Sequence, residues 1–146
     1  MYTFKLQSVL NYRQSIEEKK LLEFAEGQKH LARENDRLSE IRKEKAMLRE
    51  QLKALEGRDF NPADISLYHA YHEIFKEKEI LQLEVVRQAD EALQGLHAAL
   101  LEAVQQRKIM DNLSEKQLHD YQKKTAALER GSADETAVMR FIRSKK

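Results

Sequence analysis

The sequence of 146 residues has no cysteine and no tryptophan, and it contains only one proline and four glycines. Strands and their turns depend on glycine, proline, and β-branched or aromatic residues, so this scarcity excludes a sandwich, a barrel and a doubly wound sheet. The absence of cysteine excludes a disulfide framework and thiolate metal sites. No uncharged apolar run is long enough to span a bilayer, and the N-terminal stretch lacks the apolar region of a signal peptide. We therefore expect an all-helical, soluble, cytoplasmic protein.

The chain is rich in the residues that lose least entropy on entering a helix, namely Leu, Glu, Lys, Gln, Ala and Arg. Its 26 basic and 25 acidic side chains nearly cancel, so no bulk field draws it to nucleic acid or to a membrane. The balance holds only for the chain as a whole: residues 29–58 carry 9 basic and 6 acidic side chains, whereas residues 62–104 carry 3 and 8. The acidic stretch argues against a nucleic-acid-binding hairpin, which would need one basic face.

Apolar residues recur at alternating intervals of three and four in the first half of the chain, which is the heptad pattern of a coiled coil. We call the row of residues that faces the partner helix the seam. Its predicted members are Phe24, Gly27, Leu31, Glu34, Leu38, Ile41, Lys45, Leu48, Leu52 and Leu55. The pattern is looser toward the N-terminus, and we expect this first arm to cover residues 4–56.

A reversal at residues 57–61 separates this arm from a second periodic segment, which predicts an antiparallel helical hairpin. Asn61 suits the N-cap of the second arm and Pro62 its first helical turn. The second arm is expected at about 62–130, with Lys78, Gln82 and Gln106 interrupting its seam. The predicted seam members are Tyr68, Tyr71, Phe75, Val85, Ala89, Ala92, Leu96, Ala99, Ala103, Met110 and Leu113.

Two further features involve glycine. Gly131, followed by a capping-box pattern from Ser132 to Glu135, predicts a break and then a basic C-terminal helix at 133–144. Gly27 and Gly95 lie at similar distances from the reversal, which predicts a weak zone where they face each other. The predicted fold is all-α: one domain, residues 1–146, forming a long two-helix antiparallel coiled-coil hairpin with a short C-terminal helical extension.

No catalytic constellation is present. The sequence has no glycine-rich phosphate loop and no nucleophile motif, and a two-helix rod offers no water-excluding site. His69 and His72 have helical i, i+3 spacing, but no third ligand can be placed near them, so two solvated histidines are expected. We expect no enzyme activity, no cofactor and no metal.

Two surfaces instead suggest binding to other proteins. Tyr68, Tyr71 and Phe75 form an aromatic stripe just after the reversal, which either fills the coiled coil or contacts a partner. A second apolar track beside it exceeds what one partner helix can cover; its members are Leu67, Ile74 and Leu81. The C-terminal segment is basic and amphipathic, with Val138, Met139, Phe141 and Ile142 among Arg130, Arg140, Arg143, Lys145 and Lys146.

Three short patterns in this order resemble the FliJ family of bacterial flagellar export proteins. They are Phe4-x-Leu6-x-x-Val9-Leu10-x-Tyr12-Arg13, Tyr68-x-x-Tyr71-x-x-x-Phe75 and Asp134-Glu135-x-Ala137-x-x-Arg140-Phe141. The resemblance covers nearly the whole chain. It implies a coiled coil similar to the central stalk of rotary ATPases, located at the inner membrane only peripherally, through the export apparatus.

The resemblance also implies partners: the hexameric flagellar export ATPase (FliI), the export gate protein FlhA, and export chaperones. The positions it assigns to the ATPase ring are Phe4, Leu6, Leu10, Arg13, Arg140, Phe141 and Arg143. The positions it assigns to the gate are Tyr68, Tyr71, Phe75, Lys78 and Gln82, of which the last two depart in character from the family pattern. The alternatives are a structural coiled-coil scaffold or spacer, and the stalk protein of a virulence type III secretion system.

Overall fold

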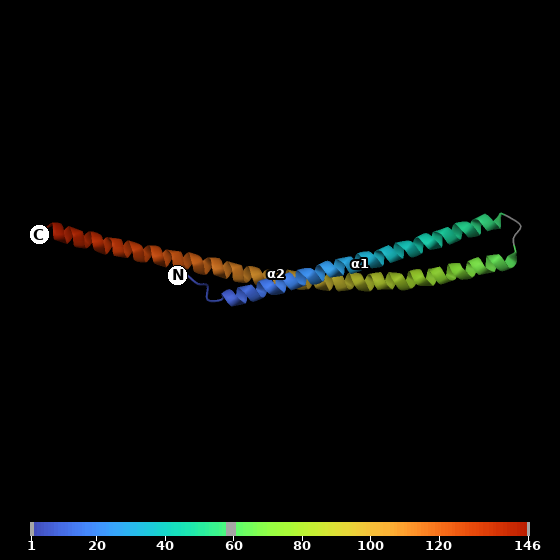
Figure 1. Ribbon diagram of the computed structural model, residues 1–146, viewed down its shortest axis with the longest axis horizontal. Coiled ribbons are helices and arrows are strands. Elements are labelled where there is room, and N and C mark those ends of the chain that lie inside the picture. Colours follow the sequence, from blue (N-terminus) through green and yellow to red (C-terminus); the bar gives the residue numbers. More distant parts are fainter. Residues whose placement is uncertain (1, 58–60, 146) are drawn as a thin grey trace. The chain divides into compact units, whose positions relative to one another are not determined.

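The computed structural model describes residues 2–57 and 61–145, and two helices account for nearly all of them. Helix α1 spans Gln7–Glu56, 50 residues, and helix α2 spans Pro62–Ser144, 83 residues (Figure 1). The described residues contain no strand, which confirms the all-α hairpin class. The reversal predicted at 57–61 lies mostly outside the described residues. No helix in the described part of the chain is long and apolar enough to cross a membrane.

The start of α2 has the predicted cap. The side-chain oxygen of Asn61 accepts a hydrogen bond from the Ala63 N–H at 3.2 Å, and its carbonyl accepts one from the Asp64 N–H at 2.9 Å. Pro62 lacks an N–H, so it leaves no donor unsatisfied in the first turn. The carboxylate of Asp64 lies in that turn, where the helix dipole favours negative charge.

The break predicted at Gly131 is wrong, because α2 continues through it to Ser144. A single glycine inside a helix costs only about 1 kcal/mol relative to alanine, and strong helix formers lie on both sides. The predicted cap residue, Ser132, instead uses its carbonyl to accept the hydroxyl hydrogen bond of Thr136 at 2.9 Å. The segment predicted as a separate helix, 133–144, is therefore the end of α2.

The contacts divide the chain into two units: residues 1–18 with 101–146, and residues 19–100. In the second unit, the 19–56 part of α1 and the 62–100 part of α2 run side by side in opposite directions (Figure 1). Every predicted seam position of α1 from Phe24 to Leu55 is buried or half-buried. The most enclosed are Leu38 and Glu34, at 6% and 7% exposure. The heptad prediction for α1 is confirmed.

The seam of α2 differs from its prediction in every second position. Tyr68, Phe75 and Ala89 lie on it as expected, but Tyr71, Val85 and Ala92 are exposed. Their places are taken by the next residue along the chain in each heptad. The observed seam of α2 in this unit is Ile65, Tyr68, His72, Phe75, Glu79, Gln82, Val86, Ala89, Leu93 and Leu96.

Polar residues of α1 explain why α2 presents this row. The Nζ of Lys45, a seam residue, donates to Glu79 at 2.9 Å, and the Nε of Arg42 donates to the same carboxylate at 3.4 Å. One heptad register of α2 places Glu79 opposite these cations, whereas the predicted register would place Lys78 there. Attraction between opposite charges in a half-buried seam therefore selects the observed rotation of α2.

Glu34 is the one buried charged side chain among the described residues, and Gln82 donates hydrogen bonds to it. The Nε2 of Gln82 donates to Glu34 Oε2 at 2.7 Å and to the Glu34 carbonyl at 2.9 Å. The hydrogen bond from Gln82 is the main cause that lowers the pKa of Glu34 below 4.5; Arg37, His30 and Arg33 add to it, and burial opposes it. A carboxylate in this seam is thus held in its charged form.

The predicted pairing of two glycines across the hairpin is wrong. A Cβ on Gly27 would lie 2.8 Å from Leu96 Cδ1 and 3.2 Å from Leu93 Cδ1, whereas a Cβ on Gly95 would meet nothing within 4 Å. Gly27 therefore lets α1 approach the leucines of α2 closely, and Gly95 faces open space.

In the other unit, the N-terminal residues lie against the 101–125 part of α2. Phe4, Leu10 and Ala103 are its buried apolar residues, at 7%, 6% and 6% exposure. The Tyr2 ring lies 5.0 Å from the Tyr121 ring. The predicted seam members Ala103, Met110 and Leu113 are buried or half-buried, as expected.

An ion cluster also joins α1 to α2 within this unit. The Nε of Arg107 donates to Glu17 at 2.6 Å, and its Nη1 donates to Asp111 at 2.6 Å. The hydrogen bond to Glu17, followed by that to Asp111, raises the pKa of Arg107. This cluster ties the first turns of α1 to one position along α2.

Candidate protein-interaction surfaces

The described residues hold no group of three or more side chains that could bind a metal ion. The two histidines singled out in the sequence differ in environment, since His69 is exposed and His72 lies half-buried on the seam. The expectation that both are solvated is therefore wrong for His72. What the structure does offer is exposed apolar surface on two parts of α2.

The first surface is a row on the outside of α2 that we call the outer stripe: Leu67, Tyr71, Ile74, Lys78, Leu81 and Val85. Its members follow the same alternation of four and three as the seam, so they lie along one line of the helix. Leu67, Tyr71, Ile74 and Leu81 are 53%, 47%, 47% and 69% exposed. The second apolar track noticed in the sequence is thus a solvent-exposed face.

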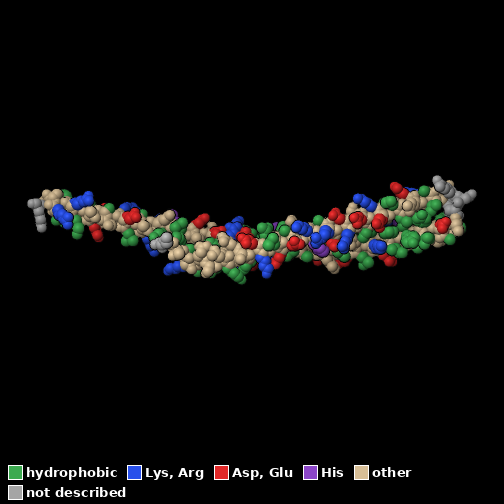
Figure 2. All heavy atoms as spheres, in the orientation of Figure 1, with side chains coloured by type: hydrophobic (Ala, Val, Ile, Leu, Met, Phe, Trp, Pro, Cys, Tyr) green, Lys and Arg blue, Asp and Glu red, His purple; other side chains and the backbone are tan. Residues whose placement is uncertain are grey.

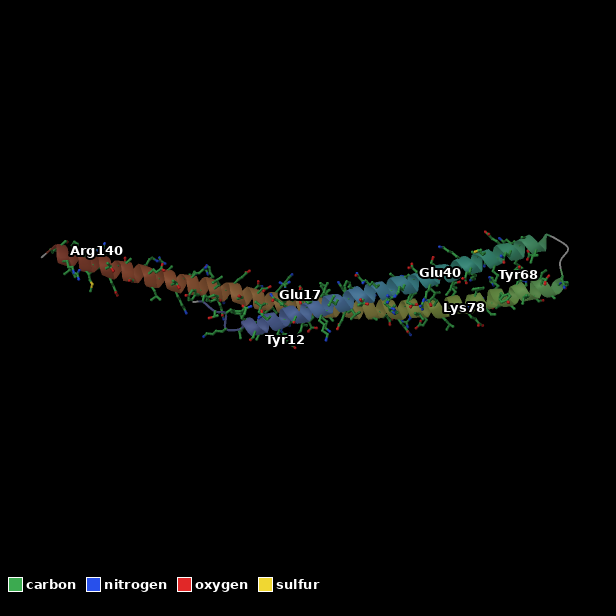
Figure 3. All side chains as sticks on the ribbon, in the orientation of Figure 1. Tyr12, Glu17, Glu40, Tyr68, Lys78 and Arg140 are labelled. Atoms are coloured by element: carbon green, nitrogen blue, oxygen red, sulfur yellow. The ribbon has the colours of Figure 1, made fainter. Side chains whose placement is uncertain are left out.

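The five positions that the resemblance assigns to the export gate are divided between the two rows. Tyr68, Phe75 and Gln82 lie on the seam, and Tyr71 and Lys78 lie on the outer stripe. Figure 3 labels Tyr68 and Lys78 on the part of α2 that runs beside α1. The Nζ of Lys78 lies 5.1 Å from the centre of the Phe75 ring, a cation–π contact that joins the rows. The amide of Gln82 is already engaged by Glu34.

A groove of about 500 Å³ adjoins the outer stripe near the start of α2. We call it the tip groove; its lining residues are Leu48, Gln51, Leu55, Asp64, Leu67, Tyr68 and Tyr71. Figure 2 shows hydrophobic side chains gathered where the first turns of α2 lie beside the last turns of α1. The sequence does not predict the α1 side of this groove, because the heptad spacing of Leu48 and Leu55 indicates only that they are seam residues. Asp64 is the one charged residue among the described residues that line the groove.

The second surface is the C-terminal extension, which we define as residues 126–145. All of its residues are exposed, and no other described segment of its unit covers them. Val138, Met139, Phe141 and Ile142 are 57%, 63%, 59% and 54% exposed. Arg140, labelled in Figure 3, and Arg143 lie among them, and the Nζ of Lys145 is 4.6 Å from the centre of the Phe141 ring.

A comparison with known protein families finds one family whose model matches the chain. The model of a family described as "Flagellar FliJ protein" matches residues 2–146. The chain belongs to the FliJ family. This confirms the resemblance seen in the three short patterns, and it makes the chain a stalk-like component of flagellar protein export. No curated protein and no solved structure matches the chain.

In this FliJ family member, the positions that the resemblance assigns to the ATPase ring lie in two environments. Phe4 and Leu10 are buried within their own unit, and Arg13 is half-buried beside the Tyr12 ring, 5.9 Å from its centre. The remaining four are exposed: Leu6, Arg140, Phe141 and Arg143. The buried pair can hold the N-terminal segment against α2, while the exposed four are free to contact another protein.

Proposed function

We propose that this protein is the stalk-like component of the flagellar type III export apparatus that inserts its termini into the ring of the export ATPase (FliI) and links that ring to the export gate protein FlhA. It also assists export chaperones. It acts in the cytoplasm, at the inner membrane only peripherally. The observation that supports this proposal most is the C-terminal extension, a helix whose apolar residues have no cover within their unit.

The chemistry of the extension suits a ring pore. Large apolar side chains that stay half-exposed on a helix are unfavourable in water and gain free energy when a partner covers them. Phe141 and Ile142 are such groups, and Arg140 and Arg143 add charge that fits an acidic pore wall. A stalk that contacts ring subunits unequally would bias their states, and the ATPase itself would carry out the hydrolysis.

We assign the contact with the gate protein to the outer stripe and the tip groove. Tyr71 and Lys78 are exposed there and can contact the gate directly. Tyr68, Phe75 and Gln82 act from the seam, since they pack or hydrogen-bond within the hairpin and position their exposed neighbours. Exposed aromatic residues in a partly enclosed groove are good anchors for a protein partner.

The test uses three forms of the chain as bait: the intact chain, a form ending at Arg130, and the double variant Tyr71→Ala with Ile74→Ala. We expect the intact chain to recover a rotary-type hexameric ATPase and the gate protein. The truncation is expected to lose the ATPase, and the double variant to lose the gate while keeping its helicity. Leu22→Ala, which changes an apolar residue that is 69% exposed and lies outside both surfaces, serves as the control.

The outcome also separates the alternatives. Failure of the intact chain to recover any ATPase would favour the coiled-coil scaffold. Recovery of an ATPase and gate from a virulence system would favour the equivalent stalk protein of that system. Loss of the ATPase from the Leu22→Ala control as well would show that the effect of truncation is not specific to the extension.

A further inference from the structure

The two exposed surfaces of α2 have the same heptad spacing. Read forward from the start of α2, one row is Asp64, Leu67, Tyr71, Ile74, Lys78 and Leu81, with intervals of 3, 4, 3, 4 and 3. Read backward from the C-terminus, a row of the extension is Lys145, Ile142, Val138, Glu135, Gly131 and Leu128, with the same intervals. Rows with matching intervals can form a continuous antiparallel seam between two helices.

When these rows are aligned in opposite directions, apolar residues meet at three of the six positions, and Ile74 lies opposite Glu135. Leu67 faces Ile142, Tyr71 faces Val138, and Leu81 faces Leu128. All six are at least 47% exposed within their own unit, so the pairing would bury surface that is otherwise open to water. Gly131 lies opposite Lys78, where its lack of a side chain leaves room for the long lysine.

The charges agree with the same alignment. Lys145, at the end of one row, faces Asp64, which lines the tip groove. Glu135 lies one helical turn from the residue opposite Lys78, within reach of its ammonium group. The opposite alignment, with the helices parallel, would place Lys145 at Leu81 and would leave Asp64 facing Leu128. Complementary charge along a coiled-coil interface favours one orientation over the other.

We propose that the outer stripe and tip groove of one copy of this chain bind the C-terminal extension of a second copy, with the two helices antiparallel. In such a pair, one copy keeps its extension unused and the other keeps its outer stripe and tip groove unused, so the contact is head-to-tail and can repeat. About 18 residues of one helix take part, which corresponds to the small end of specific interfaces, so association is weak and depends on concentration. It also weakens with salt, because both charge pairs are exposed.

The consequence for function rests on the function proposed above. Head-to-tail association would cover both the extension and the outer stripe, which are the surfaces assigned to the ATPase ring and to the gate. Binding to either partner would then compete with self-association. The free protein would be stored in a form whose exposed apolar residues are covered.

The test is sedimentation velocity of the purified full chain, with no partner present, over a wide range of protein concentration. We expect the average mass to rise with concentration and to fall again when salt is added. Val138→Glu on the extension and Leu67→Glu on the outer stripe should each abolish the rise. Leu22→Glu, the matched control with 69% exposure elsewhere on the chain, should leave it unchanged. Circular dichroism verifies that all variants remain helical.

Mixing the two inactive variants tests the head-to-tail arrangement itself. Val138→Glu keeps an intact outer stripe and Leu67→Glu keeps an intact extension, so a mixture should form one-to-one dimers and nothing larger. A charge exchange adds a second check: Lys78→Glu and Glu135→Lys should each weaken association, and the two together in one chain should restore it.

Three results would overturn the proposal: a monomer at every concentration, association that survives Val138→Glu, or no dimer in the mixture. Because no partner is present, none of these results bears on the export function. Loss of ATPase recovery in the pull-down would in turn leave the self-association result unaffected.

Discussion

A buried carboxylate is an unusual residue to find in a seam formed by only two helices. Glu34 is 7% exposed, and Gln82 supplies its hydrogen bonds from the facing helix. A hydrophobic pair at this level would bury more apolar surface, so the polar pair adds less to stability than leucines would. What it adds is a preferred alignment, because Gln82 can reach Glu34 in only one register of the two helices.

This pair predicts an asymmetry between single and double substitution. Gln82→Leu should lower the urea midpoint of unfolding, because it leaves the Glu34 carboxylate enclosed without its main donor. Glu34→Leu combined with Gln82→Leu should restore the midpoint or raise it above that of the original chain. Equilibrium unfolding followed by circular dichroism measures both. A double variant less stable than Gln82→Leu would contradict this account.

Acid should weaken the same region, and the sign follows from the direction of the pKa shifts. Gln82 donates a hydrogen bond that lowers the pKa of Glu34 below 4.5. Lys45 donates one that lowers the pKa of Glu79 below 4.5. A carboxylate whose pKa is lowered by folding stabilises the folded state fully when the pH is above its pKa in the unfolded chain. This stabilisation is lost as the pH falls through its pKa in the folded chain. The melting temperature should therefore be flat above pH 4.5 and fall below it. The Glu34→Leu, Gln82→Leu variant should show a smaller fall.

Two glycines should respond differently to the same substitution. Gly95→Ala removes the entropic cost of glycine in a helix, and its Cβ meets nothing, so a gain of about 1 kcal/mol is expected. Gly27→Ala has the same propensity gain, but its Cβ would lie 2.8 Å from Leu96 Cδ1, and overpacking costs about 1–3 kcal/mol. Gly27→Ala should thus be the less stable of the two in urea unfolding. Equal stability would mean that Leu96 moves aside freely.

At the scale of the helix, α2 carries two apolar rows of different purpose. The seam row is covered by α1, whereas the outer stripe lies only one residue away from it in each heptad and remains exposed. Sequence periodicity predicts that an apolar row exists, but it cannot say which of two adjacent rows is covered when both are apolar. In this helix the choice depends on the ion pair between Lys45 and Glu79.

Leucine truncation on each helix should separate a covered row from an exposed one. Leu38→Ala removes a side chain that is 6% exposed on the α1 seam, and buried leucines of this kind cost about 2–5 kcal/mol. Leu81→Ala removes one that is 69% exposed on the outer stripe, so a change within about 0.5 kcal/mol is expected. Urea unfolding gives both values. A large loss from Leu81→Ala would show that the outer stripe is covered by this same chain.

For the whole molecule, the sequence predicts the elements better than their exact faces. The heptad pattern of α1, the cap at Asn61 and the two-helix class are confirmed, because each depends on local spacing and capping chemistry. The predicted break at Gly131 is wrong because a single glycine inside a helix costs too little free energy to end the helix.

The sequence predicts only those parts of the candidate protein-interaction surfaces that lie on a single helix. The exposed apolar track and the basic C-terminal segment follow from composition on one helix. The tip groove does not, because three of its seven lining residues come from α1 and only the pairing of the helices brings Leu48 and Leu55 to Tyr71. Phe4 and Leu10, which the resemblance assigns to the ATPase ring, are buried within their own unit.

Stability should also vary along the whole chain in a measurable way. The amides near Leu38 and Ala89 lie where both helices are covered, so they should exchange hydrogen most slowly. Residues 126–144 are helical but covered by nothing in their unit, and a helix without tertiary contacts is only marginally stable in water. Hydrogen exchange followed by mass spectrometry at low protein concentration should show the fastest helical exchange there. Protection of that segment equal to that of residues 34–38 in the monomer would mean that α2 is stabilised along its length by its own residues, and the extension would then gain little order from any partner.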